Sequence, residues 1–471
     1  MPEYTAPGVY VEEVLPVSRP IAGVGTSTAG FIGQAGEIDA DKMPQRFDRR
    51  PFEAKGVTCT IAQNIITLTR SSTFQGLPEK EKNTAISQQC EVFVDKKSYI
   101  AEIEASDKLS INGGSAQPDS NTAVCDIKVT YYYKQVAEKT PKLVTSWQDF
   151  CQSFGDIQDS NNVLARSVYG FFDNGGTRCW VTRLQGQLAQ GGNIQDAIAQ
   201  FESIDEIAIV VVPFLEASLA SGTKRENICE AVLNHCEKMT DRFALLDGKN
   251  GTEAKKTDIY DGRNSGHGAI YWPWINDRFG KSSTDLIPPS GHIAGVYARV
   301  DATRGVHKAP ANEVIRGATG VATTATHAHQ EGLNPVGINV IRNFRDQGIC
   351  IWGARTIGGD ANGEMKYIST RRFMNFLRES IEEGTRWVVF EPNDQSLWQR
   401  ITRSVSDFLM TQWRNGALFG STPEQAFFVR CDASTNPSDT RDAGRVITEI
   451  GVAITKPAEF VIFRIQQNSG G

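Results

Sequence analysis

The chain has 471 residues, with 49 Lys and Arg against 55 Asp and Glu, so its formal net charge at pH 7 is −6. Hydrophobic residues make up 40% of the chain and charged residues 22%, which is ordinary globular usage and excludes a collagen-like, coiled-coil or wholly disordered protein. The mildly acidic balance, without a Lys- or Arg-rich block, argues against a nucleic-acid partner.

Signals for membranes, export and metals are missing from the sequence. The longest clean apolar run, residues 207–215, is interrupted by Pro213 and is far shorter than the roughly 20 residues that cross a bilayer. The first residues lack a basic segment followed by an apolar stretch, so we expect a cytoplasmic protein with no direct membrane insertion. The nine cysteines contain no C-x-x-C pair, and we expect them to be reduced and mostly buried.

Residues 1–35 are expected to supply an arm and a first core strand. Residues 9–14 form a strand-like run between Pro7 and Pro16, and the fixed φ of proline makes each end a defined bend. Several glycines then surround residues 31–32, which is typical of a strand with flexible ends.

Residues 36–140 show β-type runs and little helical periodicity. Apolar and polar residues alternate along residues 123–133, the period of two that a half-buried strand shows. Residues 112–114, Asn-Gly-Gly, are a turn signal between two such runs. We expect an all-β domain inserted into the rest of the fold and exposed on the outer surface of any assembly.

Residues 141–340 have the pattern of an α/β middle domain. An apolar run at 207–212, a helical pattern at 224–239 and a second apolar run at 243–246 form one strand–helix–strand crossover. The alternation continues with a strand at 269–275, a helix at 292–300 and a Gly- and Thr-rich surface loop at 317–332.

Residues 341–471 are expected to form a C-terminal core domain that ends in a β-arm. Strands are expected at 338–341, 348–352, 387–391, 426–432, 446–454 and 457–465, and helices at 370–383 and 395–415. The predicted fold is therefore an α/β core, a mixed sheet with helices, built from N- and C-terminal segments, with an inserted all-β domain and extended terminal β-arms.

None of the motifs has the spacing of a catalytic, cofactor or metal site. Residues 23–30 look like a nucleotide loop, but Thr28 stands where the dinucleotide pattern needs glycine. His327 and His329 lie on the predicted loop without a further ligand nearby. We expect no cofactor and no enzymatic activity. The alternative function, a cytosolic α/β enzyme of unknown substrate, has no catalytic arrangement to support it.

The two ends of the chain carry apolar strand patterns. Phe460, Val461, Ile462, Phe463 and Ile465 are apolar on both faces of the expected strand, although the segment lies at the C-terminal end. Residues 9–11 form a similar run near the N-terminus. Such a strand either closes its own sheet or adds to the sheet edge of a neighbouring subunit, and the pattern leaves both possibilities open.

Clusters at both ends resemble a known family. Residues 5–13, 19–21 and 23–27 resemble the N-terminal signature of contractile tail sheath proteins. The C-terminal third agrees in the clusters at 348–356, 371–372, 390–393, 397–398, 416–418, 442–445 and 457–460. The middle of the chain matches only loosely, and Met365 stands where relatives often have Trp.

The resemblance implies a structural protein of phage tails, tailocins, type VI secretion or extracellular contractile injection systems. Such a homo-oligomer would stack hexameric rings around an inner tube and contract to drive that tube through a target envelope. The expected partners are the tube, baseplate and terminal cap proteins. The particle would assemble in the cytoplasm of the producing cell.

Two sets of site residues follow from these expectations. The inter-subunit arms are expected to be Val9, Tyr10, Val11 and Glu12 at one end, and Phe460, Val461, Ile462, Phe463, Arg464 and Ile465 at the other. The helix at 395–415 places an apolar stripe opposite a basic face, and its three arginines are expected to face the tube: Arg400, Arg403 and Arg414.

Overall fold

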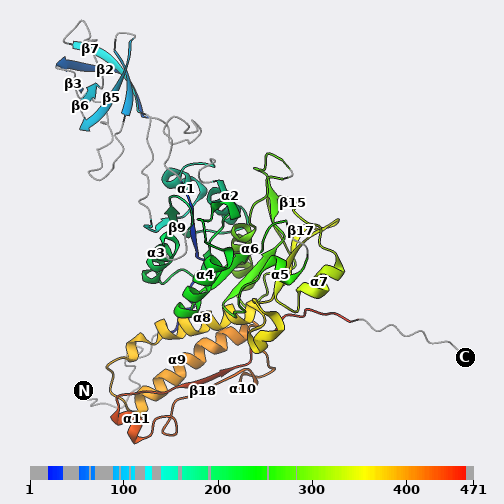
Figure 1. Cartoon of the computed structure of the whole chain (residues 1–471). Helices are drawn as coiled ribbons and strands as arrows, with labels where there is room; N and C mark the ends of the chain where they lie inside the picture. The colour runs from blue at the N-terminus through cyan, green and yellow to red at the C-terminus, as the bar shows by residue number, and fades with distance from the viewer. Residues whose placement is uncertain are drawn as a thin grey trace, which may run out of the picture.

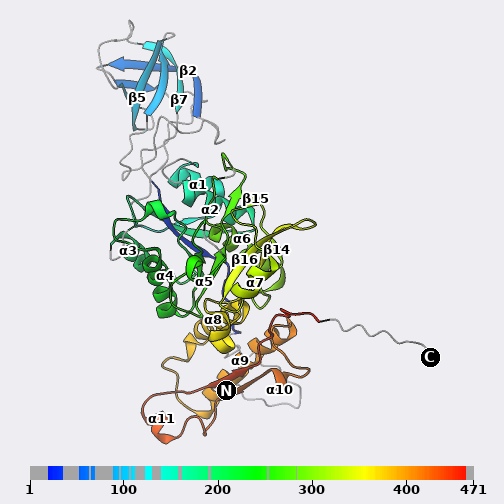
Figure 2. The ribbon, with the colours of Figure 1, turned by 45° about the vertical axis from the view of Figure 1, so that its right-hand side comes forward.

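The computed structural model describes residues 20–35, 52–62, 65–68, 89–94, 97–105, 108–111, 122–129, 139–157, 162–188, 192–251, 254–282 and 284–462. They form an α/β body, a β-barrel and a C-terminal unit of helices and strands (Figure 1). Figure 2 shows the barrel and the C-terminal unit on opposite sides of the α/β body.

A nine-stranded sheet runs through the α/β body in the order β14-β17-β16-β12-β11-β10-β1-β9-β8. The inner strands from β9 to β16 are parallel, whereas β8, β17 and β14 are antiparallel to their neighbours. In chain order the strands are β1 (Ala29–Gln34), β8 (Lys142–Val144), β9 (Cys179–Leu184), β10 (Ile209–Val211), β11 (Phe243–Asp247), β12 (Gly268–Trp272), β14 (Glu313–Val314), β16 (Ile338–Phe344) and β17 (Gly348–Trp352).

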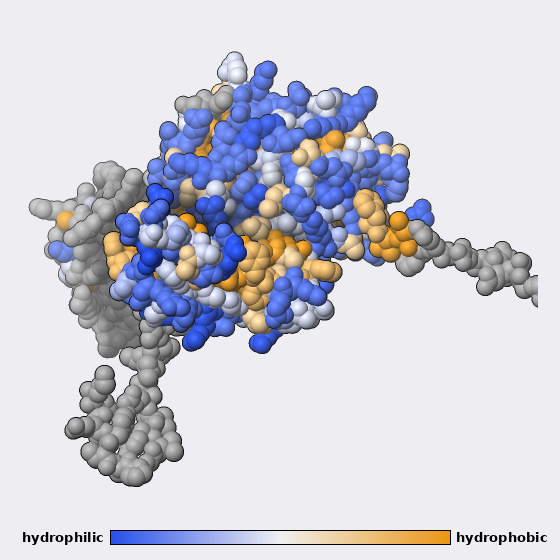
Figure 3. All heavy atoms as spheres, turned by 90° about the horizontal axis from the view of Figure 1, so that it is seen from below, coloured by the Kyte–Doolittle hydropathy of each residue, from blue (hydrophilic) through white to orange (hydrophobic). Residues whose placement is uncertain are grey.

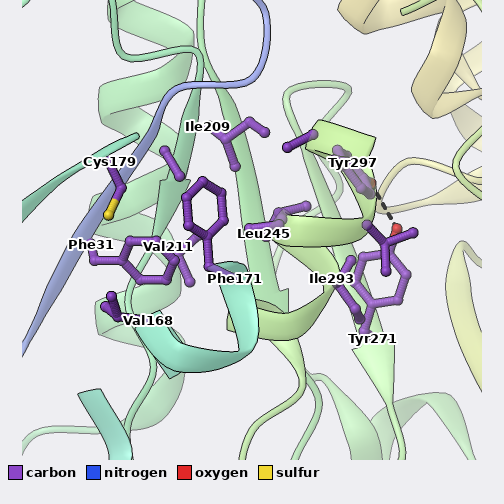
Figure 4. Packing of buried hydrophobic residues seen from close by; sticks show 14 of the residues in the cluster. Phe31, Val168, Phe171, Cys179, Ile209, Val211, Leu245, Tyr271, Ile293 and Tyr297 are labelled. Atoms are coloured by element: carbon purple, nitrogen blue, oxygen red, sulfur yellow. Dashed lines mark hydrogen bonds between the residues drawn. The ribbon is translucent and has the colours of Figure 1, made fainter. Parts of the chain in front are cut away.

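Helices cover both faces of this sheet, which explains the continuous apolar runs of its parallel strands. Phe31 of β1 lies in the cluster on one face, with its ring 5.5 Å from that of Phe171, and Ile32 lies in the cluster on the other (Figure 4). The first face is covered by α1 (Trp147–Phe154), α2 (Asn162–Asp173) and α6 (Ser290–Arg304), and the second by α3 (Asn193–Gln200) and α4 (Arg225–Met239).

Short elements complete the α/β body. They are η2 (Phe201–Ser203), η3 (Glu216–Ser218), α5 (Lys256–Ile259), β13 (Ile275–Asp277), β15 (Ala318–Val321), α7 (His327–Leu333) and η4 (Gly359–Met365).

The strands between β1 and β8 in the sequence form a closed barrel in the order β2-β3-β6-β5-β4-β7. Their bounds are β2 (Phe52–Ala62), β3 (Ile65–Leu68), β4 (Gln89–Val94), β5 (Lys97–Ala105), β6 (Lys108–Ile111) and β7 (Thr122–Val129). Cys59 is buried in the barrel and disulfide-bonded, so the expectation of reduced cysteines is wrong for this residue. Six others are free and buried: Cys151, Cys179, Cys229, Cys236, Cys350 and Cys431.

The C-terminal unit is organised around two long helices. The apolar stripe predicted for the helix at 395–415 is buried, and it packs with α8 residues and with Ile21 from the N-terminal segment. The carboxylate of Asp394 starts α9 by accepting a hydrogen bond from the amide of Leu397 at 2.8 Å. The elements are α8 (Ile368–Gly384), η5 (Arg386–Val388), α9 (Gln395–Arg414), α10 (Pro423–Ala426), β18 (Phe427–Arg430), α11 (Ser438–Asp442) and β19 (Glu449–Val452).

The structure corrects several sequence-based boundaries. The strand expected at 387–391 is instead a 3-10 turn followed by an exposed connection to α9, with Val389 65% exposed and no strand among the described residues paired with it. The expected loop at 317–332 contains β15, paired with β13, and α7, which Thr326 caps. The boundary expected between residues 340 and 341 falls inside β16, because the β16–β17 hairpin extends the nine-stranded sheet.

Candidate functional site: the root of the C-terminal arm

Several side chains of the α/β body converge on Glu459, near the end of the described residues. Arg355 donates two hydrogen bonds to its carboxylate, from Nε to Oε1 at 2.9 Å and from Nη2 to Oε2 at 2.8 Å. The Tyr367 hydroxyl donates to Oε2 at 3.1 Å, and the Asn334 amide donates to Oε1 at 2.6 Å. Paired N–H groups on one guanidinium fix both the position and the plane of a carboxylate.

At Glu459, burial and the surrounding hydrogen bonds shift the pKa of the carboxylate in opposite directions. Burial alone would raise the pKa of Glu459, but hydrogen bonds from Arg355 and Asn334 outweigh it and hold that pKa below its usual value. Burial and the nearby Glu459 carboxylate raise the pKa of Tyr367. The ion pair is therefore fully charged at neutral pH, with the tyrosine protonated as a donor.

All of the described residues after Glu459 are exposed. Phe460, Val461 and Ile462 are 71%, 68% and 80% exposed. Figure 3 shows apolar surface where the chain leaves the body at its C-terminal end. The sequence predicts a strand here, but residues 457–462 form none, because no strand of the described chain lies beside them. Phe463, Arg464 and Ile465 lie outside the described residues.

A groove of about 860 Å³ lies beside this arm root. Its walls come from the segment after α6, from α7, from the end of β17 and from residues 455–461. The apolar lining includes Trp352, Tyr367 and Phe460, with Lys308 and Glu331 among its charged residues. An apolar concave surface next to an exposed apolar segment is the kind of place where a further chain segment binds.

The N-terminal arm residues Val9, Tyr10, Val11 and Glu12 lie outside the described residues. The segment that follows them reaches the C-terminal unit: the amide of Val24 donates to Ser380 Oγ of α8 at 3.1 Å, and Ile21 joins the core of that unit. Residues 21–24 therefore pack against the C-terminal unit.

The three arginines of α9 have different surroundings. Arg403 and Arg414 are exposed, and Asp407 lies exposed between them. Arg400 is only 22% exposed because its guanidinium pairs with Glu391 at 3.0 Å and lies over the ring of Trp387 at 5.2 Å. Arg400 therefore contributes little to the exposed basic face that the sequence predicts for this helix.

Neither a metal site nor a membrane-spanning helix is found among the described residues. In the part of the chain that the structure describes, His, Cys, Asp and Glu side chains form no group of three or more that could hold a metal ion. Over the same residues, none of the helices is long and apolar enough to cross a membrane.

Sequence reasoning missed the Glu459 anchor. It identified residues 348–356 and 457–460 as two separate family-like clusters, and the structure brings them together through Arg355 and Glu459. Each cluster contains a single charged residue, Arg355 in the first and Glu459 in the second, and the two charges are of opposite sign. Nothing in their spacing, 104 positions apart, indicated that they meet.

Comparisons with known proteins find domains of one protein family over most of the body and the C-terminal unit. Residues 188–357 match the model for the phage tail sheath protein central domain, and residues 360–468 match that for the phage tail sheath C-terminal domain. A putative prophage major tail sheath protein of Pseudomonas aeruginosa is 24% identical over 73% of this chain and 89% of its own length. A tail sheath protein of Vibrio phage KVP40 is 26% identical over 37% of this chain and 26% of its own length.

Solved structures show the same fold. The sheath of the extracellular contractile injection system PVC, in its contracted state, aligns with a TM-score of 0.65 at 22% identity, over 100% of this chain and 99% of the other. A chain of the six-fold symmetrised baseplate of the anti-feeding prophage aligns with a TM-score of 0.59 at 28% identity, over 76% of this chain and 99% of the other. The chain belongs to the phage tail sheath protein family.

Proposed function

We propose that this sheath subunit polymerises through its terminal arms into stacked hexameric rings around an inner tube, and that the stack contracts to drive the tube through a target envelope. The observation that carries the proposal is the abrupt change at Glu459. A carboxylate held by four hydrogen bonds is followed at once by three apolar residues, each at least 68% exposed.

Exposed apolar residues at the end of a chain favour association. Burial of each large apolar side chain contributes roughly 1.5 to 3 kcal/mol, whereas an exposed ion pair contributes about 0 to 1 kcal/mol. A strand added to a neighbour's sheet also satisfies its own backbone donors and acceptors. The small sheet of β18 and β19 in the C-terminal unit offers an acceptor for such strands, and Phe428 on it is 57% exposed.

The solved relatives support the architecture of the proposed assembly. One is a sheath complex in a contracted state, and another belongs to a six-fold symmetrised baseplate. By analogy, the partners of this chain are further copies of itself, an inner tube, a baseplate and terminal cap proteins. The role needs no cofactor or nucleic acid, and assembly takes place in the cytoplasm of the producing cell.

The position of the barrel supports the proposal that one side of the subunit faces the tube and the opposite side faces outward. The barrel and the C-terminal unit lie on opposite sides of the body (Figures 1 and 2). We place the C-terminal unit, with Arg403 and Arg414 of α9, toward the tube, and the barrel toward the outside. The domain division at residues 1–35, 36–140, 141–340 and 341–471 belongs to this proposal, with residues 341–352 assigned to the α/β middle domain, because β16 and β17 lie in its sheet.

Electron microscopy of the purified chain, alone and co-expressed with its tube protein, tests the proposal. We expect tubes or stacked rings with six-fold symmetry. A strictly monomeric protein under both conditions, at concentrations where a relative forms sheaths, would contradict it.

A further inference from the structure

The anchor at Glu459 is connected by hydrogen bonds to the middle of the nine-stranded sheet. We infer that Glu459, Arg355 and Asn339 form a relay that ties the C-terminal arm to the sheet and fixes the point at which a neighbouring subunit pulls on this one. The inference rests on the proposed assembly, and it makes these three residues positioning residues for polymerisation.

The first link of the relay joins the arm to Arg355. The side chain of Arg355 is 4% exposed and that of Glu459 is 18% exposed, so the pair is largely shielded from water. The pair depends on Arg355 in particular, since without it the largely buried Glu459 carboxylate would lose its countercharge. The guanidinium also bonds the Asn334 carbonyl at 3.2 Å and pairs with Asp360 at 3.0 Å, which fixes its position from two further sides.

The second link joins Arg355 to the sheet. The Arg355 amide donates to Asn339 Oδ1 at 2.8 Å, and Asn339 Nδ2 donates to the Arg355 carbonyl at 2.8 Å. The same Nδ2 donates to the carbonyl of Ile270 on β12 at 3.1 Å. Asn339 is fully buried on β16, so the relay ends between two parallel strands of the core.

The other contacts near the arm root are weaker or further back in the chain. Lys456 pairs with Glu364, but their side chains are 51% and 82% exposed. The Thr455 amide bonds the carbonyl of Ala417 within the C-terminal unit at 3.1 Å. Glu459 is thus the last residue before the exposed arm, and its contacts are the ones that lead to the sheet of the body. A pull on the arm reaches the body through this carboxylate.

Matched variants separate the relay from a merely structural ion pair. Glu459→Gln keeps the size of the side chain and removes its charge, and Tyr367→Phe removes a single donor. Glu364→Gln is the control, since it makes the same chemical change in an exposed pair whose other member, Lys456, lies just before Glu459 in the chain. Folding is followed by thermal unfolding, anchoring by hydrogen exchange of the amides at positions 455, 456, 458 and 459, and assembly by sheath length in electron micrographs.

We expect Glu459→Gln to leave a folded subunit, because Asp360 still pairs with Arg355, to accelerate exchange at 455–459 and to raise the subunit concentration needed for assembly by about tenfold. Tyr367→Phe should give a smaller change in the same direction, and Glu364→Gln none. Arg355→Lys, which keeps the charge but loses the bidentate geometry, should behave like Glu459→Gln.

Failure of the relay can be told apart from failure of the proposed assembly. Unchanged exchange and normal sheaths in Glu459→Gln, together with blocked assembly in Ile462→Pro, would overturn the relay alone. Normal sheaths in Ile462→Pro would instead overturn arm exchange itself. Accelerated exchange with normal assembly would show that the anchor is structural and would also overturn the inference.

Discussion

Arg372 of α8 and Asp301 of α6 form a buried ion pair that joins the C-terminal unit to the α/β body. The guanidinium donates to the two carboxylate oxygens at 2.9 and 2.6 Å, and the two side chains are 4% and 5% exposed. Arg372 also donates to the carbonyl of Thr26 at 2.9 Å, and the Thr26 hydroxyl donates to Asp301 at 2.7 Å. Three distant parts of the chain therefore meet at one pair of charges.

Removing one partner of this pair should strongly destabilise the subunit. In Arg372→Ala the Asp301 carboxylate stays buried without its countercharge, so we expect the free energy of unfolding to fall by about 3–5 kcal/mol. Urea unfolding at pH 7 measures this. Arg430→Ala is the control, because the pair of Arg430 with Glu449 is about half exposed and its loss should change the stability little. Equal effects of the two variants would refute this assignment.

The stability of the subunit should also depend on pH, because a carboxylate at the contact between the α/β body and the C-terminal unit has a raised pKa. The pKa of Glu379 on α8 is raised to about 7, first by burial and then by Asp241 and Glu383, with Asp205 acting in the same direction and Arg242 opposing them. Burial raises the pKa of Asp241 as well. Glu379 and Asp241 line the same small cavity, against Phe243 of β11.

The sign follows from the raised pKa. The folded chain keeps a proton on Glu379 that the unfolded chain, with the ordinary value of 4.5, releases. Its contribution to stability is therefore present below pH 4.5 and is lost as the pH rises to about 7. Relative to the native chain, Glu379→Gln should be more stable at pH 8 by about 1–2 kcal/mol, a figure reduced for partial exposure, with little difference at pH 4.5.

Urea unfolding of Glu379→Gln and the native chain across pH 4.5 to 8 measures the difference. Glu382→Gln, an exposed change on the same helix, should leave the pH profile unaltered. A stability difference that does not grow with pH would contradict the assignment to Glu379.

Proline in the arm should block polymerisation without unfolding the subunit. Ile462 is 80% exposed and outside any strand of the subunit, so Ile462→Pro removes no ladder bond within it. In a strand added to a neighbour's sheet, the same change removes a backbone donor. We expect monomers of normal thermal stability and no tubes in electron micrographs, and the same for Val11→Pro in the other arm. Ile462→Val, which keeps the amide, should assemble. Full-length sheaths from Ile462→Pro would mean that the arm is not part of a shared sheet.

The sequence predicts local elements of this fold better than their partners. The strands β10 and β11 and the helix α4 were predicted because their apolar runs and helical spacing are strong. The sequence analysis does not predict the strand β9 or the helices α1 and α2, although Ser146 is an N-cap for α1, its hydroxyl oxygen accepting from the Asp149 amide at 3.1 Å. The Gly- and Thr-rich sequence around 317–332 predicts a loop, whereas the Thr326 cap starts α7 there.

Contacts between residues distant in the chain could not be predicted from the sequence, for a physical reason. Periodicity reports which face of an element is apolar, but the partner of a buried charge depends on how distant elements pack. Arg372 and Asp301 are 71 positions apart, and neither is marked by its neighbours. For the arm, the apolar pattern at 460–465 indicates that a partner strand exists, but not whether that strand belongs to the same chain.

The barrel should be removable, because its entry and exit lie on either side of one strand. The Ala35 amide bonds the Leu184 carbonyl of β9 at 3.1 Å, and the Lys139 amide bonds that of Arg183 at 3.0 Å. Two strand spacings separate these points, about 10 Å, which a few residues can span. Deleting residues 40–138 and inserting a short Gly/Ser bridge should leave a folded body that assembles. Circular dichroism and electron microscopy check this, and loss of the folded body would refute it.

The exposed arginines of α9 should bind an acidic surface of the tube. Arg403 and Arg414 are 11 positions apart, three helical turns, and so lie on one face, whereas Arg400 is engaged with Glu391 and Trp387. We therefore expect Arg403→Glu with Arg414→Glu, rather than a change at Arg400, to weaken assembly on the tube and leave the subunit folded.

Exposed charge pairs are worth about 0 to 1 kcal/mol each and are screened by salt, so the native assembly should also weaken above about 0.15 M salt. Co-sedimentation of subunit and tube at several salt concentrations measures both effects. Arg386→Glu, an exposed charge reversal outside α9, is the control, and unchanged co-sedimentation of the double variant would show that this face does not contact the tube.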